Sequence, residues 1–323
     1  MTAQRPSRLL ALLQLTRAGL ALTALSNIWL VLWLDRYLNP LHAMRDLWVD
    51  LLSTAAVALG TYTFGMTLND LMDARRDRLI HPDRPLPSGR LSPATAAAIV
   101  VGSLLVAIAG SIPLGTHSTF LALATATLIL FYNGPGKHVA GLGILLLGII
   151  RALHMLIAAP EIGFLWPAWL ALTHVAGVSA LCHRLEEKRP PLIGAHVWLL
   201  TLGWAFLSLG VIGWMGREGQ LTLPNHPWAL IWPGAAAVAF LIPLSIILSR
   251  SPDPRRAGRT LMKLALAWLI LYDASWLASL RLYTPALIHA SLLILTLLGT
   301  RIPRGFSGNW KPRAGLIRSP NRG

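Results

Sequence analysis

Residues 68–89 read LNDLMDARRDRLIHPDRPLPSG and begin where the apolar run over residues 47–68 ends. The whole chain has only 13 acidic residues, and this short stretch holds several of them. They are Asp70, Asp73, Asp77 and Asp83. Carboxylates gathered directly after a long apolar segment indicate a polar site at the end of a buried helix.

Apolar runs of about the length that crosses a bilayer recur along the chain. Of all residues, 54% are hydrophobic and 13% are charged, against about 25% charged in a soluble domain. We therefore predict an all-α polytopic membrane bundle of nine to ten transmembrane helices, the number depending on whether Pro285 bends one element or separates two. The runs cover residues 18–34, 47–68, 93–114, 118–132, 139–159, 164–182, 192–214, 228–249, 261–281 and 284–300.

The net charge of +15 comes from basic residues in the connections between these runs. Such a distribution reports membrane topology, and it argues against a nucleic-acid partner. It predicts a cytoplasmic N-terminus and a cytoplasmic acidic stretch, in a bacterial-type inner (plasma) membrane. We expect one domain over residues 1–300 and a basic, flexible tail over residues 301–323, close to anionic membrane lipids. The single cysteine, Cys182, excludes an intrachain disulfide and a cysteine-based zinc site.

Asp70, Asp73 and Asp77 share one face with Asn69 if the second apolar run continues as a helix. Carboxylates so close together repel one another unless a positive charge neutralises them. Mg²⁺ prefers oxygen ligands and often binds one or two carboxylates together with substrate phosphate oxygens. The pattern predicts a site for a magnesium-bound phosphate or diphosphate, and the alternative is a solvated acidic loop paired with neighbouring arginines. The proposed metal ligands on this face are Asn69, Asp70, Asp73 and Asp77.

Three sequence motifs resemble the UbiA superfamily of intramembrane prenyltransferases. NDLMDARRD at residues 69–77 matches the N-D-x-x-D-x-x-x-D signature of that family, and RPLPSG at residues 84–89 matches the segment that follows it. FYNGPGK at residues 131–137 stands where the family has a tyrosine-to-lysine motif. The first motif is highly specific, and the other two support it.

The resemblance implies a bundle of mostly nine helices around a central cavity that opens to lipid. An isoprenyl diphosphate would bind Mg²⁺ at the cytoplasmic mouth, lose its diphosphate and transfer the prenyl group to a small hydrophobic or aromatic acceptor. Arg84 and Lys137 are candidates to stabilise the leaving diphosphate, or they are plain cytoplasmic anchors. Tyr132 either stabilises a cation through its ring or is an interfacial tyrosine.

A charged residue lies deep in the run over residues 139–159. Arg151 and His154 are one turn apart there, and the family often has an arginine and an asparagine at this spacing. Arg151 therefore contacts the diphosphate or the acceptor, with His154 beside it, or it forms a structural pair with Asp273. Asn27 in the first run faces the substrate or forms a helix–helix hydrogen bond.

The second acidic motif of the family, usually two aspartates separated by three residues, is altered in this chain. CHRLEEKRPP stands there, at residues 182–191. Adjacent helical residues point about 100° apart, so Glu186 and Glu187 cannot both face the site. One of them, Glu186 in particular, is predicted to serve a second metal with help from His183, and the alternative is a solvated surface run. This departure places the chain in a divergent branch.

Mg²⁺-dependent prenyl transfer is the function that the sequence favours. A prenyl-lipid binding or transport protein is the alternative, but transporters interrupt their helices near the midplane, whereas the polar residues here gather at one mouth. A CDP-alcohol phosphotransferase requires glycines among its aspartates, and NDLMDARRD has none. The acceptor and the prenyl chain length cannot be read from the sequence.

Overall fold

The structure, a computed structural model, describes residues 8–223 and 226–299. Its regular elements within these ranges are helices, and one isolated bridge joins Leu223 and His226. The predicted tail over residues 301–323 lies outside the described residues. The helices are α1 (Arg8–Leu15), α2 (Ala18–Leu38), α3 (Pro40–Ala43), α4 (Leu47–Met72), α5 (Ala74–Ile80), α6 (Pro93–Ser111), η1 (Ile112–Leu114), α7 (Thr116–Asn133), η2 (Gly136–His138), α8 (Ala140–Leu156), α9 (Trp166–Leu185), α10 (Gly194–Arg217), α11 (Ile231–Ala239), α12 (Leu241–Arg250), α13 (Pro254–Ser279) and α14 (Tyr283–Gly299).

The predicted all-α membrane class is confirmed. Among the described residues, six helical segments are long and apolar enough to cross a membrane, and α8 and α14 are shorter apolar helices. A count of nine to ten spans stays a prediction. The apolar run over residues 228–249 is divided at Phe240 into α11 and α12. Pro285 lies in the first turn of α14, where its missing N–H interrupts no helical hydrogen bond.

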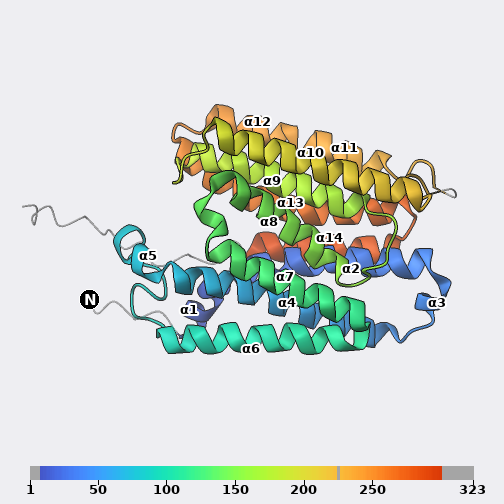
Figure 1. The fold of residues 1–323 in the computed structure, drawn as a ribbon, viewed down its shortest axis with the longest axis horizontal. Coiled ribbons are helices and arrows are strands. Elements are labelled where there is room, and N and C mark those ends of the chain that lie inside the picture. The colour runs from blue at the N-terminus through green and yellow to red at the C-terminus, as the bar shows by residue number, and fades with distance from the viewer. Residues whose placement is uncertain (1–7, 224–225, 300–323) are drawn as a thin grey trace, which may run out of the picture.

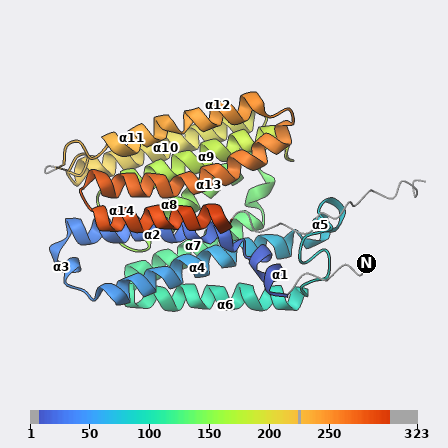
Figure 2. The ribbon, with the colours of Figure 1, turned by 180° about the vertical axis from the view of Figure 1, so that it is seen from behind.

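The helices lie roughly side by side, with short elements at the two ends of the bundle (Figure 1). The α5 helix, which carries the end of the acidic motif, lies with α1 at one end, and α3 lies at the opposite end in both views (Figures 1 and 2). The largest apolar core joins α2, α8, α9 and α13. The acidic motif is therefore held at one end of a packed helical scaffold.

Close packing of α4 on α6 fixes the helix that delivers the acidic motif. A β-carbon added at Gly60 of α4 would lie 2.7 Å from the carbonyl oxygen of Ser103 and 2.8 Å from the backbone nitrogen of Ala107. On α6, a β-carbon at Gly110 would lie 2.9 Å from the carbonyl oxygen of Ser53. Only glycine allows the two backbones to approach so closely, as at small-residue interfaces of membrane helices.

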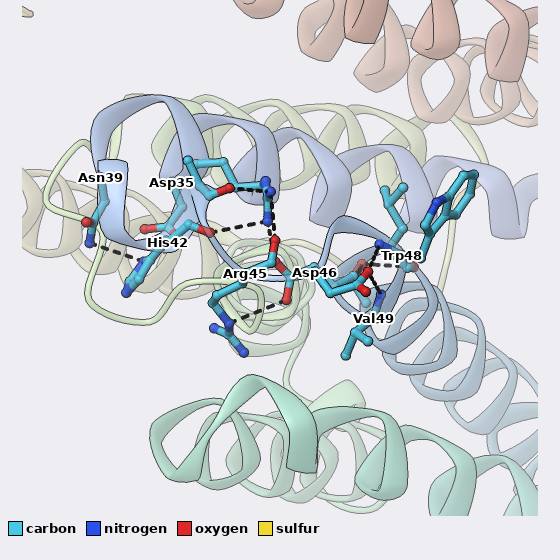
Figure 3. Close-up of polar contacts among 12 residues, drawn as sticks. Asp35, Asn39, His42, Arg45, Asp46, Trp48 and Val49 are labelled. Atoms are coloured by element: carbon cyan, nitrogen blue, oxygen red, sulfur yellow. Dashed lines mark hydrogen bonds and ion pairs between the residues drawn. The ribbon is translucent and has the colours of Figure 1, made fainter.

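Polar contacts fix the connection from α2 to α4 at the end opposite the motif. Asp46 caps α4 by accepting a 2.8 Å bond from the backbone N–H of Trp48 (Figure 3). Arg36 donates to Asp50 at 2.7 Å and also to backbone carbonyls of His42, Ala43 and Arg45. These contacts satisfy the charges at this end internally and fix the N-terminal end of α4.

Candidate active site

The acidic motif crosses the junction of α4 and α5. Although α4 ends at Met72, the N–H of Asp73 donates to the carbonyl of Asn69 at 3.0 Å. The N–H of Asp77 donates in turn to the carbonyl of Asp73 at 2.8 Å. These bonds continue the helical spacing through the junction, so the motif residues follow one side of the backbone, as the sequence predicts. Asp70 and Asp77 are buried.

Each of the three motif carboxylates is paired with one cation from outside the motif. The pairing offsets the mutual repulsion of carboxylates at helical spacing. It also places three cations at the site where the sequence predicts a diphosphate. The pairs are Asp70 with Arg17 at 3.0 Å, Asp73 with Lys137 at 2.7 Å, and Asp77 with Arg84.

Arg17 is the residue at this site that sequence reasoning missed. It lies between α1 and α2, and its φ of 48° and ψ of 43° place its backbone in the left-handed region. A basic residue directly before the first apolar run is also what the positive-inside rule produces. The sequence therefore gives no signal that separates Arg17 from an ordinary cytoplasmic anchor.

The RPLPSG segment forms the turn that aims Arg84 at Asp77. The carbonyl of Arg84 accepts a 2.6 Å bond from the hydroxyl of Ser88, and Gly89 takes a φ of 73°, which glycine adopts readily. The side chain of Leu86 is buried beneath the turn. Burial lowers the pKa of the neighbouring His81, and the positive charge of Arg84 lowers it further. His81 is therefore protonated less readily beside this pair than a free histidine is.

The FYNGPGK segment positions Lys137 and Tyr132. A β-carbon added at Gly143 of α8 would lie 3.1 Å from the Cα atom of Lys137, so the turn packs tightly on α8. Tyr132, near the end of α7, lies within electrostatic range of Asp73 and Arg17. The structure thus brings Tyr132 and Lys137 to the acidic motif, and their roles in catalysis stay predictions.

The second, altered motif lies at the end of α9 and contacts the start of α13. Glu187 is exposed and pairs with Arg255 at 2.6 Å. Glu186 is less exposed and lies 3.5 Å from Lys188. The two carboxylates have different partners. The sequence prediction treated them as adjacent helical residues, but α9 ends at Leu185 and Glu187 takes a left-handed φ of 50°. Their assignment to a second metal stays a prediction. The ring of His183 bonds to the carbonyl of Pro190 at 2.8 Å, which closes the loop after α9.

A buried polar network joins α2, α8 and α13 within the bundle. Asn27 donates to Asp273 at 2.6 Å, and its side-chain oxygen accepts a 2.6 Å bond from Nε of Arg151. Ser26 donates to the same carboxylate oxygen, and Arg151 also donates to the carbonyl of Thr23 at 2.7 Å. Asn27 thus forms a helix–helix hydrogen bond and connects Arg151 to Asp273, although the sequence suggested a direct pair. Substrate contact by Asn27 and Arg151 stays a prediction.

His154 lies one turn from Arg151 and is 4% exposed, beside the backbone of Ala58 on α4. Within residues 8–223 and 226–299, neither ring nitrogen of His154 makes a hydrogen bond of good geometry. Its predicted role beside the substrate is not tested by these contacts.

The donors of the first motif fit Mg²⁺ in their chemistry. Each ion pair uses one oxygen of its carboxylate: Oδ1 of Asp70, Oδ1 of Asp73 and Oδ2 of Asp77. The described residues hold no cluster of three His, Cys, Asp or Glu side chains already arranged around a metal position. Hard oxygen donors along one helical side match what Mg²⁺ binds, provided that the carboxylates turn from their cations to the metal.

A family model described as the UbiA prenyltransferase family matches residues 28–187, about half of the chain. The matched segment contains the acidic motif, the RPLPSG turn and the FYNGPGK segment. The chain belongs to the UbiA prenyltransferase family. The resemblance stated from the motifs is therefore confirmed, and the family match ends at Glu187, in the altered second motif.

Curated relatives match this UbiA family member over part of their length. A digeranylgeranylglyceryl phosphate synthase of Saccharolobus solfataricus is 30% identical over 34% of this chain and 38% of its own. A protein of the same name from Methanoregula boonei is 29% identical over 41% of this chain and 47% of its own. The chain thus matches less than half of the length of these relatives.

A solved structure reported in work on digeranylgeranylglyceryl phosphate synthase in membranes covers 84% of this chain and 98% of its own. Its TM-score is 0.59 at 16% sequence identity. The likeness shows a shared fold over most of the chain, so it extends beyond the residues of the family match.

Proposed function

We propose that the chain transfers a prenyl group from an isoprenyl diphosphate to an acceptor within the membrane, in a Mg²⁺-dependent reaction. The observation that carries the proposal is the pairing of three carboxylates with three cations at one end of the bundle. Carboxylates supply metal ligands, and cations supply charge for a diphosphate, so the set matches both needs of such a substrate. Membership of the UbiA family supports this reading.

Asn69, Asp70, Asp73 and Asp77 would hold the metal. Bound there, Mg²⁺ would neutralise part of the negative charge on the diphosphate. Glu186, at the end of α9, is proposed for the second side of the site.

The chain's own residues stabilise the separated charges of the reaction. The bond between C1 of the prenyl chain and the diphosphate oxygen breaks, and its electron pair leaves with the diphosphate. Lys137 and Arg84 provide positive charge for this leaving group. The ring of Tyr132 is proposed to stabilise the allylic cation. The acceptor nucleophile then bonds to C1 and releases its proton to water or to the departing diphosphate.

The prenyl chain is proposed to lie among the apolar helices, in a cavity that opens to lipid. The acceptor is proposed to be a small hydrophobic, aromatic or lipid-like molecule. The names of the curated relatives make a glyceryl phosphate lipid the first acceptor class to test.

The site is proposed to face the cytoplasm of a bacterial-type inner membrane. Basic residues lie within the acidic motif at Arg75 and Arg76 and directly after it at Arg78, and others surround the start of α13 at Arg255 and Arg256. The loop that joins α12 to α13 lies at the same end of the bundle as α5 (Figures 1 and 2). Basic residues concentrated at one end of a helical bundle favour the cytoplasmic side for that end.

Diphosphate release tests the proposal directly. The purified chain in lipid nanodiscs would receive geranylgeranyl diphosphate and Mg²⁺, with and without a glyceryl phosphate lipid or a pooled lipid extract. Acceptor-stimulated release that is lost in Asp70→Asn is expected, and mass spectrometry would identify the product. The matched control is Asp83→Asn, which removes a carboxylate of the same stretch that forms none of the three ion pairs. Tight diphosphate binding without release under any acceptor would support the alternative, a prenyl-lipid binding or transport protein.

A further inference from the structure

The short helix α1 lies across the base of the candidate site. Ala11 and Leu15 are fully buried against Leu86 and Leu91 of the turn after the acidic motif, and against Ala96 of α6. Leu71 and Ala74, which flank the junction of α4 and α5, pack against the same cluster. The segment from Arg8 to Arg17, here called the strap, therefore touches the elements that carry the motif.

The strap has anchors that do not involve the acidic motif. Besides its apolar face, the side-chain oxygen of Gln14 accepts a 2.7 Å bond from Arg90. Arg90 also donates to the carbonyl of Asp83 at 2.6 Å, which joins the strap to the turn. Because these contacts hold α1 by themselves, Arg17 can change its partner while the strap stays in place.

The geometry of Arg17 suits a residue that changes partners. Its guanidinium lies 3.0 Å from Oδ1 of Asp70, and its side chain is 32% exposed whereas that of Asp70 is 8% exposed. The guanidinium thus reaches from an open position onto a buried carboxylate. Arg17 also lies within electrostatic range of Tyr132, on the side of the site where the diphosphate is proposed to bind.

We propose that Arg17 is an exchange residue: it neutralises Asp70 while the site is empty and turns to the diphosphate when a divalent cation takes Asp70. The inference rests on the proposed function and deepens it. A guanidinium on a carboxylate competes with a metal for the same oxygen, so the empty protein binds a divalent cation weakly. Once diphosphate is present, the displaced guanidinium gains a second anion to pair with, so metal and diphosphate bind cooperatively.

Two equilibrium measurements on the full chain in phosphatidylcholine nanodiscs test this exchange. The affinity for Mn²⁺ alone is measured by electron paramagnetic resonance, and the affinity for inorganic pyrophosphate is measured at saturating Mn²⁺. Arg17→Gln should bind Mn²⁺ about fivefold more tightly and pyrophosphate about fivefold more weakly. Arg17→Lys should restore both affinities in part. The exposed Arg8 of the same helix gives the matched control, Arg8→Gln, which should change neither affinity.

The outcomes separate this inference from the proposed function. Unchanged Mn²⁺ affinity in Arg17→Gln, with binding lost in Asp70→Asn, would overturn the exchange and leave the metal assignment standing. Unchanged Mn²⁺ affinity in Asp70→Asn would overturn both. Weaker pyrophosphate binding without tighter Mn²⁺ binding would make Arg17 a simple anion contact and also overturn the exchange. Arg17→Gly suits the left-handed backbone and is the second neutral variant if Arg17→Gln does not fold.

Discussion

The ammonium of Lys137 lies 2.7 Å from Oδ1 of Asp73, so the turn after α7 is joined to the junction of α4 and α5. The two residues are far apart in sequence, and both side chains are largely buried. The contact places a positive charge beside a proposed metal ligand. In an enzyme that expels diphosphate, such a charge stabilises the leaving group most where negative charge develops.

Replacing Lys137 should therefore reduce the chemical step. We expect Lys137→Gln to lower the single-turnover rate of diphosphate release about 100-fold, as the loss of one preorganised electrostatic contact does elsewhere. The adjacent, exposed His138 provides the control His138→Gln, which should release diphosphate at the normal rate. A normal rate in Lys137→Gln would show that Lys137 does not stabilise the leaving group and is a cytoplasmic anchor.

The altered second motif predicts different effects for its two glutamates. The side chain of Glu186 is 19% exposed and that of Glu187 is 71% exposed. Glu186→Gln should lower turnover about tenfold with a smaller change in diphosphate binding, as when a supporting group of a metal site is lost. Glu187→Gln, which breaks only an exposed pair with Arg255, should leave turnover nearly normal. Steady-state kinetics compare the two, and normal turnover in both variants would assign the whole run to the surface.

The apolar runs and the NDLMDARRD motif made the helical class and the acidic site predictable. Both depend on local patterns, since a span needs a continuous apolar run and the motif needs helical spacing. The division of one run at Phe240 was not predictable, because its residues are apolar on both sides of the break.

Long-range pairing was the part that the sequence could not supply. Arg17 forms its ion pair with Asp70 from a left-handed backbone conformation, which non-glycine residues rarely adopt. In the same way, the position of Arg151 inside a span predicted that it has a partner. It did not predict that Asn27 lies between Arg151 and Asp273. Both depend on how helices pack, which no single segment encodes.

The α4–α6 contact predicts a stability effect at Gly60. Gly60→Ala would place a methyl group 2.7 Å from the carbonyl oxygen of Ser103, so the helices must separate. We expect the free energy of unfolding to fall by about 1–3 kcal/mol, as in overpacked cores. Gly102→Ala on α6 meets open space and is the matched control, with unchanged or slightly higher stability. Unfolding in mixed detergent micelles measures both, and equal stability of the two variants would contradict tight packing at Gly60.

The buried network predicts that Arg151 and Asp273 stabilise the bundle only as a set. Asp273→Ala leaves the Arg151 side of the network without its carboxylate and should lower the free energy of unfolding by about 3–5 kcal/mol. The double variant Arg151→Met with Asp273→Leu removes both charges, so its loss should be smaller than that of Asp273→Ala.

Ser275→Ala provides the control for this cycle, because its hydroxyl donates within α13, to the carbonyl of Tyr272 at 2.7 Å. It should unfold as the parent chain does, in the same micelle titration. If the double variant loses as much stability as the single variants Arg151→Met and Asp273→Leu added together, Arg151 and Asp273 are not coupled through Asn27. A double variant that folds but cannot bind pyrophosphate would show that Arg151 also contacts the substrate, which is the role predicted for it from its depth in the span.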